Sequence, residues 1–135
     1  MIDIENQVYS KIRTELLLTY PQINMPQAYT PQVTTFPCVI VEEKTNLPNV
    51  STITTHSTEN YSDLMYEINI YTNSTTKKTD AKAIRNIIND IMMNYFGMER
   101  NYCSNIPNLV DSSIYRIVLR YTCKVDNDTL KIYRR

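Results

Sequence analysis

The sequence predicts a single α+β domain in which two helices pack on one face of a largely antiparallel sheet of four to five strands. Two segments carry apolar residues at helical spacing, and two others alternate apolar and polar residues as half-buried strands do. The predicted order is α-β-β-β-α-β-β, which groups the strands as α+β proteins do. With 135 residues, 42% of them hydrophobic, the chain suits one domain spanning 1–135.

The first predicted helix covers residues 2–19. Its apolar stripe repeats every four residues: Ile4, Val8, Ile12 and Leu16. Pro21 ends it, because the residue before a proline is driven out of helical geometry. Residues 21–37 then hold four prolines and are expected to form an extended arm. This arm is long for a connection inside a compact domain, so we expect it to contact a partner.

Three strands are predicted next. Residues 36–43 (FPCVIVEE) predict a covered strand, because 38–41 are apolar on both faces, and Glu42 and Glu43 mark its emergence into solvent. Residues 50–56 are threonine-rich and predict a second strand, so that 44–61 would form a projecting hairpin. Residues 61–72 alternate with a period of two, and one face carries Leu64, Tyr66, Ile68 and Ile70.

A second helix is predicted from Thr79 to Phe96, with Thr79 or Asp80 as its N-cap. Its stripe is formed by Ala81, Ile84, Ile88, Ile91 and Tyr95. Gly97, the only glycine, follows directly, in the position where helices favour a left-handed residue. Residues 101–110 are expected to be irregular, 114–125 to form the most clearly alternating strand, and 129–133 to form a short closing strand.

The charge balance bears on the kind of partner. Lys and Arg number 14, as do Asp and Glu, so the net charge is zero. Binding to nucleic acid or to an anionic membrane surface needs a basic field, so neither is expected as a specific partner. A neutral chain also lacks the self-repulsion that opposes association. The first residues do not resemble a signal peptide, and no stretch approaches a membrane span, so we expect assembly in the cytoplasm.

Metal binding and thiol chemistry are not expected. The chain has one histidine, His56, and three cysteines: Cys38, Cys103 and Cys123. A Cys₃His zinc site is conceivable, but structural zinc ligands usually come in close pairs, and these are far apart. A cysteine nucleophile paired with His56 is also conceivable. Free thiols and a surface histidine are the simpler interpretation.

Other catalytic signals are weak. The neighbours Glu42 and Glu43 should point to opposite faces of a strand, and Asp126 and Asp128 should lie in a turn, so neither pair resembles the carboxylates of a glycosidase. A single glycine cannot build a phosphate-binding loop. We therefore expect no enzymatic activity and no cofactor.

Arginine and tyrosine suggest a protein-binding role. Arg116, Arg120 and Lys124 share one face of the predicted strand 114–125. This face could be solvated, could be a salt-bridged subunit interface, or could lie near passing DNA. The chain has 11 tyrosines, and tyrosine and arginine are enriched where proteins meet proteins.

The layout as a whole resembles a known family. An amphipathic helix, a proline-containing stretch, FPCVIVEE, a threonine-rich hairpin and LMYEINIYT are followed by DAKAIRNIINDIM, IYRIVLRYTCKV and TLKIY. This resembles the tail-terminator and tail-completion (neck) proteins of tailed bacteriophages and of phage-tail-like particles. The resemblance spans nearly the whole chain and rests on element order and strand character.

The resemblance implies a structural virion protein that forms a homohexameric ring on the last ring of the tail tube. Such a ring stops tube growth and connects the tube to neck or head-completion proteins, in some particles also to sheath, and DNA can pass through it. A head-closure or head–tail adaptor protein is an alternative, and a small cytosolic enzyme or regulatory module is another. The residues expected at the subunit or tube interface are Tyr29, Phe36, Glu42, Glu43, Lys44, His56, Tyr61, Arg116, Arg120 and Arg134.

Overall fold

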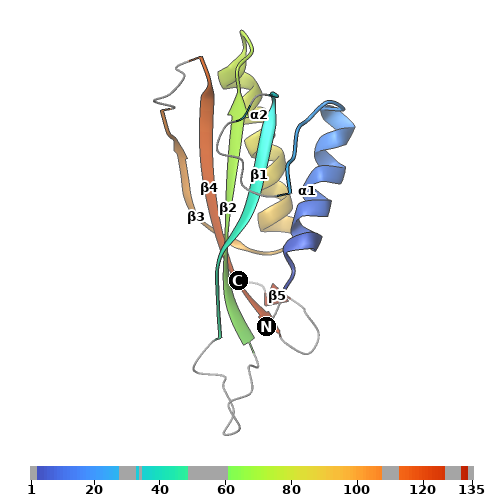
Figure 1. Cartoon of the computed structure of the whole chain (residues 1–135). Helices are drawn as coiled ribbons and strands as arrows, with labels where there is room; N and C mark the ends of the chain where they lie inside the picture. The colour runs from blue at the N-terminus through green and yellow to red at the C-terminus, as the bar shows by residue number, and fades with distance from the viewer. Residues whose placement is uncertain are drawn as a thin grey trace, which may run out of the picture.

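The computed structural model describes residues 3–27, 33, 35–48, 61–107, 113–126 and 132–133. It confirms the α+β class (Figure 1). The elements are α1 (Glu5–Thr19), β1 (Cys38–Pro48), β2 (Tyr61–Thr72), α2 (Lys77–Asp90), a short π-helix (Ile91–Tyr95), β3 (Glu99–Asn105), β4 (Tyr115–Asp126) and β5 (Ile132–Tyr133). In the described part of the chain, no helix is both long and apolar enough to cross a bilayer.

The strands form one antiparallel sheet in the order β1-β2-β4-β3, and β5 pairs with the end of β4. β2 and β4 pair along their whole length, from Tyr61 opposite Asp126 to Thr72 opposite Tyr115. The long antiparallel register between these two strands fixes which side chains share a face. β1 and β3 are the two edges, and each contains an irregularity in its pairing.

Both helices lie on the same side of the sheet (Figure 1). The main core fills the space between them and the sheet. It contains the whole predicted stripe of α1 (Ile4, Val8, Ile12 and Leu16), the predicted face of β2 (Leu64, Tyr66, Ile68 and Ile70) and, from α2, Ala81, Ile84 and Ile88. The alternating residues Ile117, Leu119, Tyr121 and Val125 complete it from β4. One sheet face is therefore committed to the core by the period of two.

Two strand predictions need correction. β1 does not end at Glu43 but continues to Pro48, because residues 45–48 pair with the start of β2. Pro48 is tolerated there since β1 is an edge strand. Residues 101–110 are not wholly irregular, because β3 pairs with β4 over Glu99–Asn105. Almost every β3 side chain is exposed, so the strand leaves no apolar period in the sequence. The predicted strand 50–56 lies outside the described residues.

The second helix also differs in detail. α2 begins at Lys77 with Thr76 as its N-cap, ahead of the predicted start. The end of the predicted helix is instead the π-helix, which follows α2 directly. A π-helix has about one more residue per turn than an α-helix, so its side chains turn away from the predicted stripe. Met92 and Phe96 are buried, whereas Tyr95, which was predicted to lie on the apolar stripe, is 56% exposed. Gly97 has a φ of 72°, which confirms its predicted left-handed position.

The described part of the 21–37 arm packs against its own chain. Asn24 forms a parallel bridge with Cys38: the amide of Val39 donates to the carbonyl of Asn24 at 2.9 Å. The Tyr9 hydroxyl donates to the carbonyl of Met25 and ties this segment to α1. Residues 23–25 therefore cover the start of the β1 edge within the same molecule.

Candidate interaction surface

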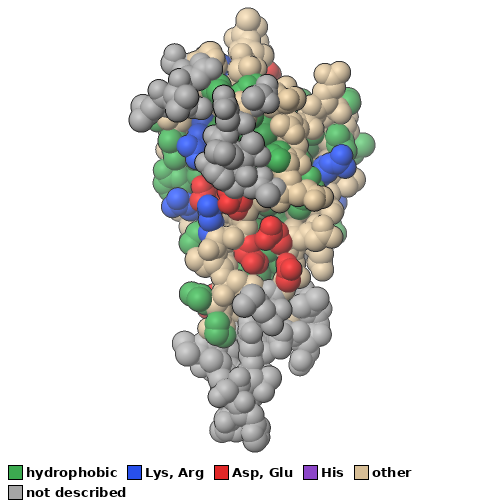
Figure 2. Space-filling model, viewed as in Figure 1, with side chains coloured by type: hydrophobic (Ala, Val, Ile, Leu, Met, Phe, Trp, Pro, Cys, Tyr) green, Lys and Arg blue, Asp and Glu red, His purple; other side chains and the backbone are tan. Residues whose placement is uncertain are grey.

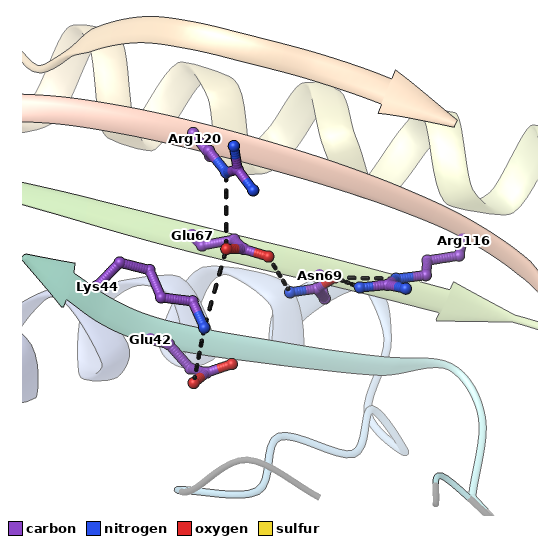
Figure 3. A network of polar contacts seen from close by, with 6 residues as sticks. All are labelled: Glu42, Lys44, Glu67, Asn69, Arg116 and Arg120. Atoms are coloured by element: carbon purple, nitrogen blue, oxygen red, sulfur yellow. Dashed lines mark hydrogen bonds and ion pairs between the residues drawn. The ribbon is translucent and has the colours of Figure 1, made fainter. Parts of the chain in front are cut away.

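The sheet face turned away from the helices, called here the open face, carries a connected polar network (Figure 3). It consists of six side chains from β1, β2 and β4: Glu42, Lys44, Glu67, Asn69, Arg116 and Arg120. Four of these residues were predicted to lie at an interface. The antiparallel register brings them together, because it sets Glu42 opposite Glu67 and Glu67 opposite Arg120.

Glu67 is the centre of the ion pairs. Its side chain is only 12% exposed and lies 3.6 Å from Arg120 Nε and 3.9 Å from Lys44 Nζ. Lys44 Nζ also lies 3.3 Å from Glu42 Oε2. Two carboxylates directly opposite each other on neighbouring strands would repel. The Lys44 ammonium, from the irregular position of β1, offsets that repulsion.

Asn69 extends the network to Arg116. Its side-chain amide donates to Glu67 Oε1 at 3.2 Å. Its oxygen accepts two hydrogen bonds from Arg116, from Nε at 3.0 Å and from Nη2 at 2.7 Å. The guanidinium also lies 5.5 Å from the centre of the Tyr71 ring. Arg116 is thus held in place by neutral groups, and it forms no ion pair with any carboxylate among the described residues.

The open face continues across β4 onto β3. The Arg120 guanidinium lies 5.1 Å from the centre of the Tyr102 ring, a cation–π distance. Tyr102 is 38% exposed and the Arg120 side chain 45%, so both present an amphipathic surface to solvent. Next to them, the Thr122 hydroxyl donates a hydrogen bond to Asn101 Oδ1 at 2.7 Å.

A shallow concavity of about 410 Å³ adjoins this network. Its lining is Thr45, Leu47, Asp63, Leu64, Met65, Gly97, Glu99, Thr122, Cys123 and Lys124. Leu47, one of these lining residues, is 61% exposed. At the other end of the open face, Cys38, Ile40 and Tyr71 form a small buried cluster, and half-buried Phe36 packs on it. The predicted interface residue Phe36 is therefore largely committed to its own chain.

Glu43 lies apart from the network. As expected, it points to the opposite face from Glu42, and its carboxylate accepts a hydrogen bond from the buried Tyr66 hydroxyl at 3.0 Å. It lies near Asp3 and Glu5 at the start of α1. Burial, and then the charges of Glu43, Asp3 and Glu42, raise the pKa of Glu5. We call Asp3, Glu5 and Glu43 the acidic corner.

Other predicted interface residues fall largely outside the description. Tyr29, His56 and Arg134 lie outside the described residues. Tyr61 begins β2 and is paired with Asp126 through its backbone.

The residues predicted to lie at the interface did not include Glu67, Asn69 or Tyr102. Glu67 and Asn69 alternate with the core residues of 61–72, so their face was predictable. Their partners in β4 were not, since the register between β2 and β4 is set by distant backbone pairing.

Two of the thiols, Cys38 and Cys123, are poorly suited to nucleophilic chemistry. Burial raises the pKa of Cys38 to about 11 and, with help from the charges of Glu43 and Asp63, that of Cys123 to about 12. Both are protonated at neutral pH, whereas the thiolate is the reactive form. Over the described stretches, no group of three or more His, Cys, Asp or Glu side chains could hold a metal ion.

Neither a comparison with models of known protein families nor one with curated proteins found a match for this chain.

Proposed function

We propose that this chain is a structural protein that assembles into a ring, caps the end of a phage tail tube, stops its growth and connects it to the neck. The observation that carries this proposal is the open face. It holds fixed arginines, an exposed tyrosine and a polar network on the side of the sheet opposite both helices. Tyrosine and arginine anchors on a rigid sheet are what a protein partner binds best.

The way the apolar and polar side chains are used favours a structural role over catalysis. The apolar stripes of both helices and of one sheet face are used in the core. The polar groups of the open face pair with one another instead of converging on a cavity. A ring subunit needs two surfaces that meet different neighbours, and such a surface requires no activated nucleophile or base.

Localisation in a tail or neck particle, assembled in the host cytoplasm, belongs to the same proposal. The partners would be further copies of the chain, the tail-tube protein and neck or head-completion proteins. The resemblance described above in element order and strand character is the reason for choosing a tail tube over other protein partners.

The first test is the oligomeric state. Size-exclusion chromatography with light scattering, performed alone and beside preformed tail tubes, should show a ring-sized species or binding to tubes. A protein that stays monomeric in both conditions would reject the ring.

The second test addresses the capping role. Adding the protein to polymerising tube subunits should shorten the tubes in a dose-dependent way, and electron microscopy should show a particle at one tube end. A variant of the open face, Arg120→Ala with Tyr102→Ala, should shorten the tubes less than the natural protein at equal concentration. Unchanged tube lengths with the natural protein would reject the terminator role and favour an adaptor role in the neck.

A further inference from the structure

Counted over the described residues alone, the open face and the acidic corner carry opposite charges that no ion pair matches. In the open-face network, Lys44, Arg116 and Arg120 supply three positive charges against two from Glu42 and Glu67. Within the described part of the chain, the cation without a carboxylate partner is Arg116, which contacts Asn69 and the Tyr71 ring.

The acidic corner has the complementary imbalance. The Asp3 carboxylate accepts a hydrogen bond from the backbone amide of Glu5 at 3.1 Å, and the Glu43 carboxylate accepts one from the Tyr66 hydroxyl. None of the three carboxylates forms an ion pair within the described residues. Figure 2 shows Asp and Glu side chains gathered in one group, apart from the place where acidic and basic side chains interleave.

These two surfaces are formed by different residues. Glu42 belongs to the open face, whereas its neighbour Glu43 reaches Tyr66 on the helix side of the sheet. One molecule can therefore use its open face for one neighbour and its acidic corner for another. Such a heterologous contact builds a ring or a filament, whereas a self-complementary patch builds a closed dimer.

Two copies could also associate by pairing their edge strands into a longer sheet. Both edge strands, β1 and β3, have features that oppose such pairing. β1 has a pairing irregularity between Glu43 and Thr45, and β3 has one between Arg100 and Tyr102. Bulges and charged side chains are the usual protection of edge strands against pairing with another chain. A contact through the sheet face avoids this obstacle.

We propose that a second copy of this chain docks its acidic corner on Arg116 and Arg120 of the open face. This inference rests on the proposed self-association. Arginine binds carboxylates in a planar, two-pronged geometry, and Arg116 is already held in position by Asn69, so less side-chain freedom is lost on docking. The exposed ring of Tyr102 lies beside the same site and adds apolar contact.

Charge reversal on each surface tests the pairing. The open-face variant is Arg116→Glu with Arg120→Glu. The corner variant is Asp3→Lys with Glu5→Lys, which makes the corner positive overall and leaves Glu43 to accept the hydrogen bond from the Tyr66 hydroxyl. The combined variant carries all four substitutions. Self-association is measured by sedimentation velocity over a wide concentration range.

Each single-surface variant should associate at least about tenfold more weakly than the natural protein, because like charges then face each other. The combined variant should recover most of the affinity, and an equal mixture of the two single-surface variants should co-assemble. Recovery by the combined variant also shows that the substituted chain folds. Arg13→Glu with Lys82→Glu makes the same charge change as the open-face variant, but at exposed helix positions, and should leave association unchanged.

Association that persists unchanged in both single-surface variants would overturn this pairing while leaving a ring intact. Loss in both without recovery in the combined variant would equally overturn it. A natural protein that is monomeric at every concentration and beside tubes would overturn the pairing and the proposed function together.

Discussion

Asn69 is the residue whose removal most directly tests whether the open-face network is a fixed structure. The side chain is 4% exposed and joins Glu67 to Arg116 through three hydrogen bonds. A hydrogen bond to a charged group contributes about 1.5–3 kcal/mol to stability. The two bonds from Arg116 share one acceptor, and the half-buried guanidinium can regain water. We therefore expect Asn69→Ala to lower the free energy of unfolding by about 2–3 kcal/mol.

Urea unfolding followed by circular dichroism measures this loss. With a slope of about 1–3 kcal/mol per molar urea, the midpoint should fall by roughly 1 M. Asn73→Ala, at an exposed position directly after β2, is the matched control and should change stability by less than about 0.5 kcal/mol. A double-mutant cycle with Arg116→Ala should give a coupling of about 1–2 kcal/mol. Coupling near zero, or equal effects of the two asparagine variants, would refute the reasoning.

Three further predictions concern the core, the acidic corner and the thiols. Ile88→Ala, at a fully buried position, should cost about 3–4 kcal/mol in the same unfolding assay; a loss below about 1 kcal/mol would contradict the described core. The raised pKa of Glu5 means that the folded state holds this proton more tightly, so stability falls as pH rises through the ordinary value of 4.5. Glu5→Gln should therefore raise the melting temperature at neutral pH, and the gain should vanish below that value; a neutral-pH loss would contradict it. Iodoacetamide should label exposed Cys103 before Cys38 and Cys123, as read by peptide mass spectrometry; equal rates would contradict the described burial.

Much of the fold could be predicted because burial leaves a period in the sequence. β2 has the predicted bounds, and every residue of the predicted α1 stripe is buried. β3 could not be found in this way, since its side chains are exposed on both faces and carry no apolar alternation. The π-helix moved Tyr95 out of the core, and such a local change of helical period has no clear signal in one sequence.

The candidate surface was predictable only in part. Arg116 and Arg120 share a face because they are an even number of residues apart, and this follows from strand geometry alone. The partners of the two arginines, Asn69 and Glu67, depend on a register between segments about fifty residues apart. That register is set by the packing of the whole sheet, so a strand pattern read alone gives the face but not the pairs.

The strands of this sheet are longer than the helices that cover them. β2 has 12 residues and α1 has 15, which correspond to roughly 40 Å and 22 Å at their ordinary rises per residue. β1, β2 and β4 accordingly run on past α1 as a narrow ribbon (Figure 1). Backbone amides at that distal end should exchange with deuterium sooner than those beneath the helices, since local fraying there leaves the helix packing intact.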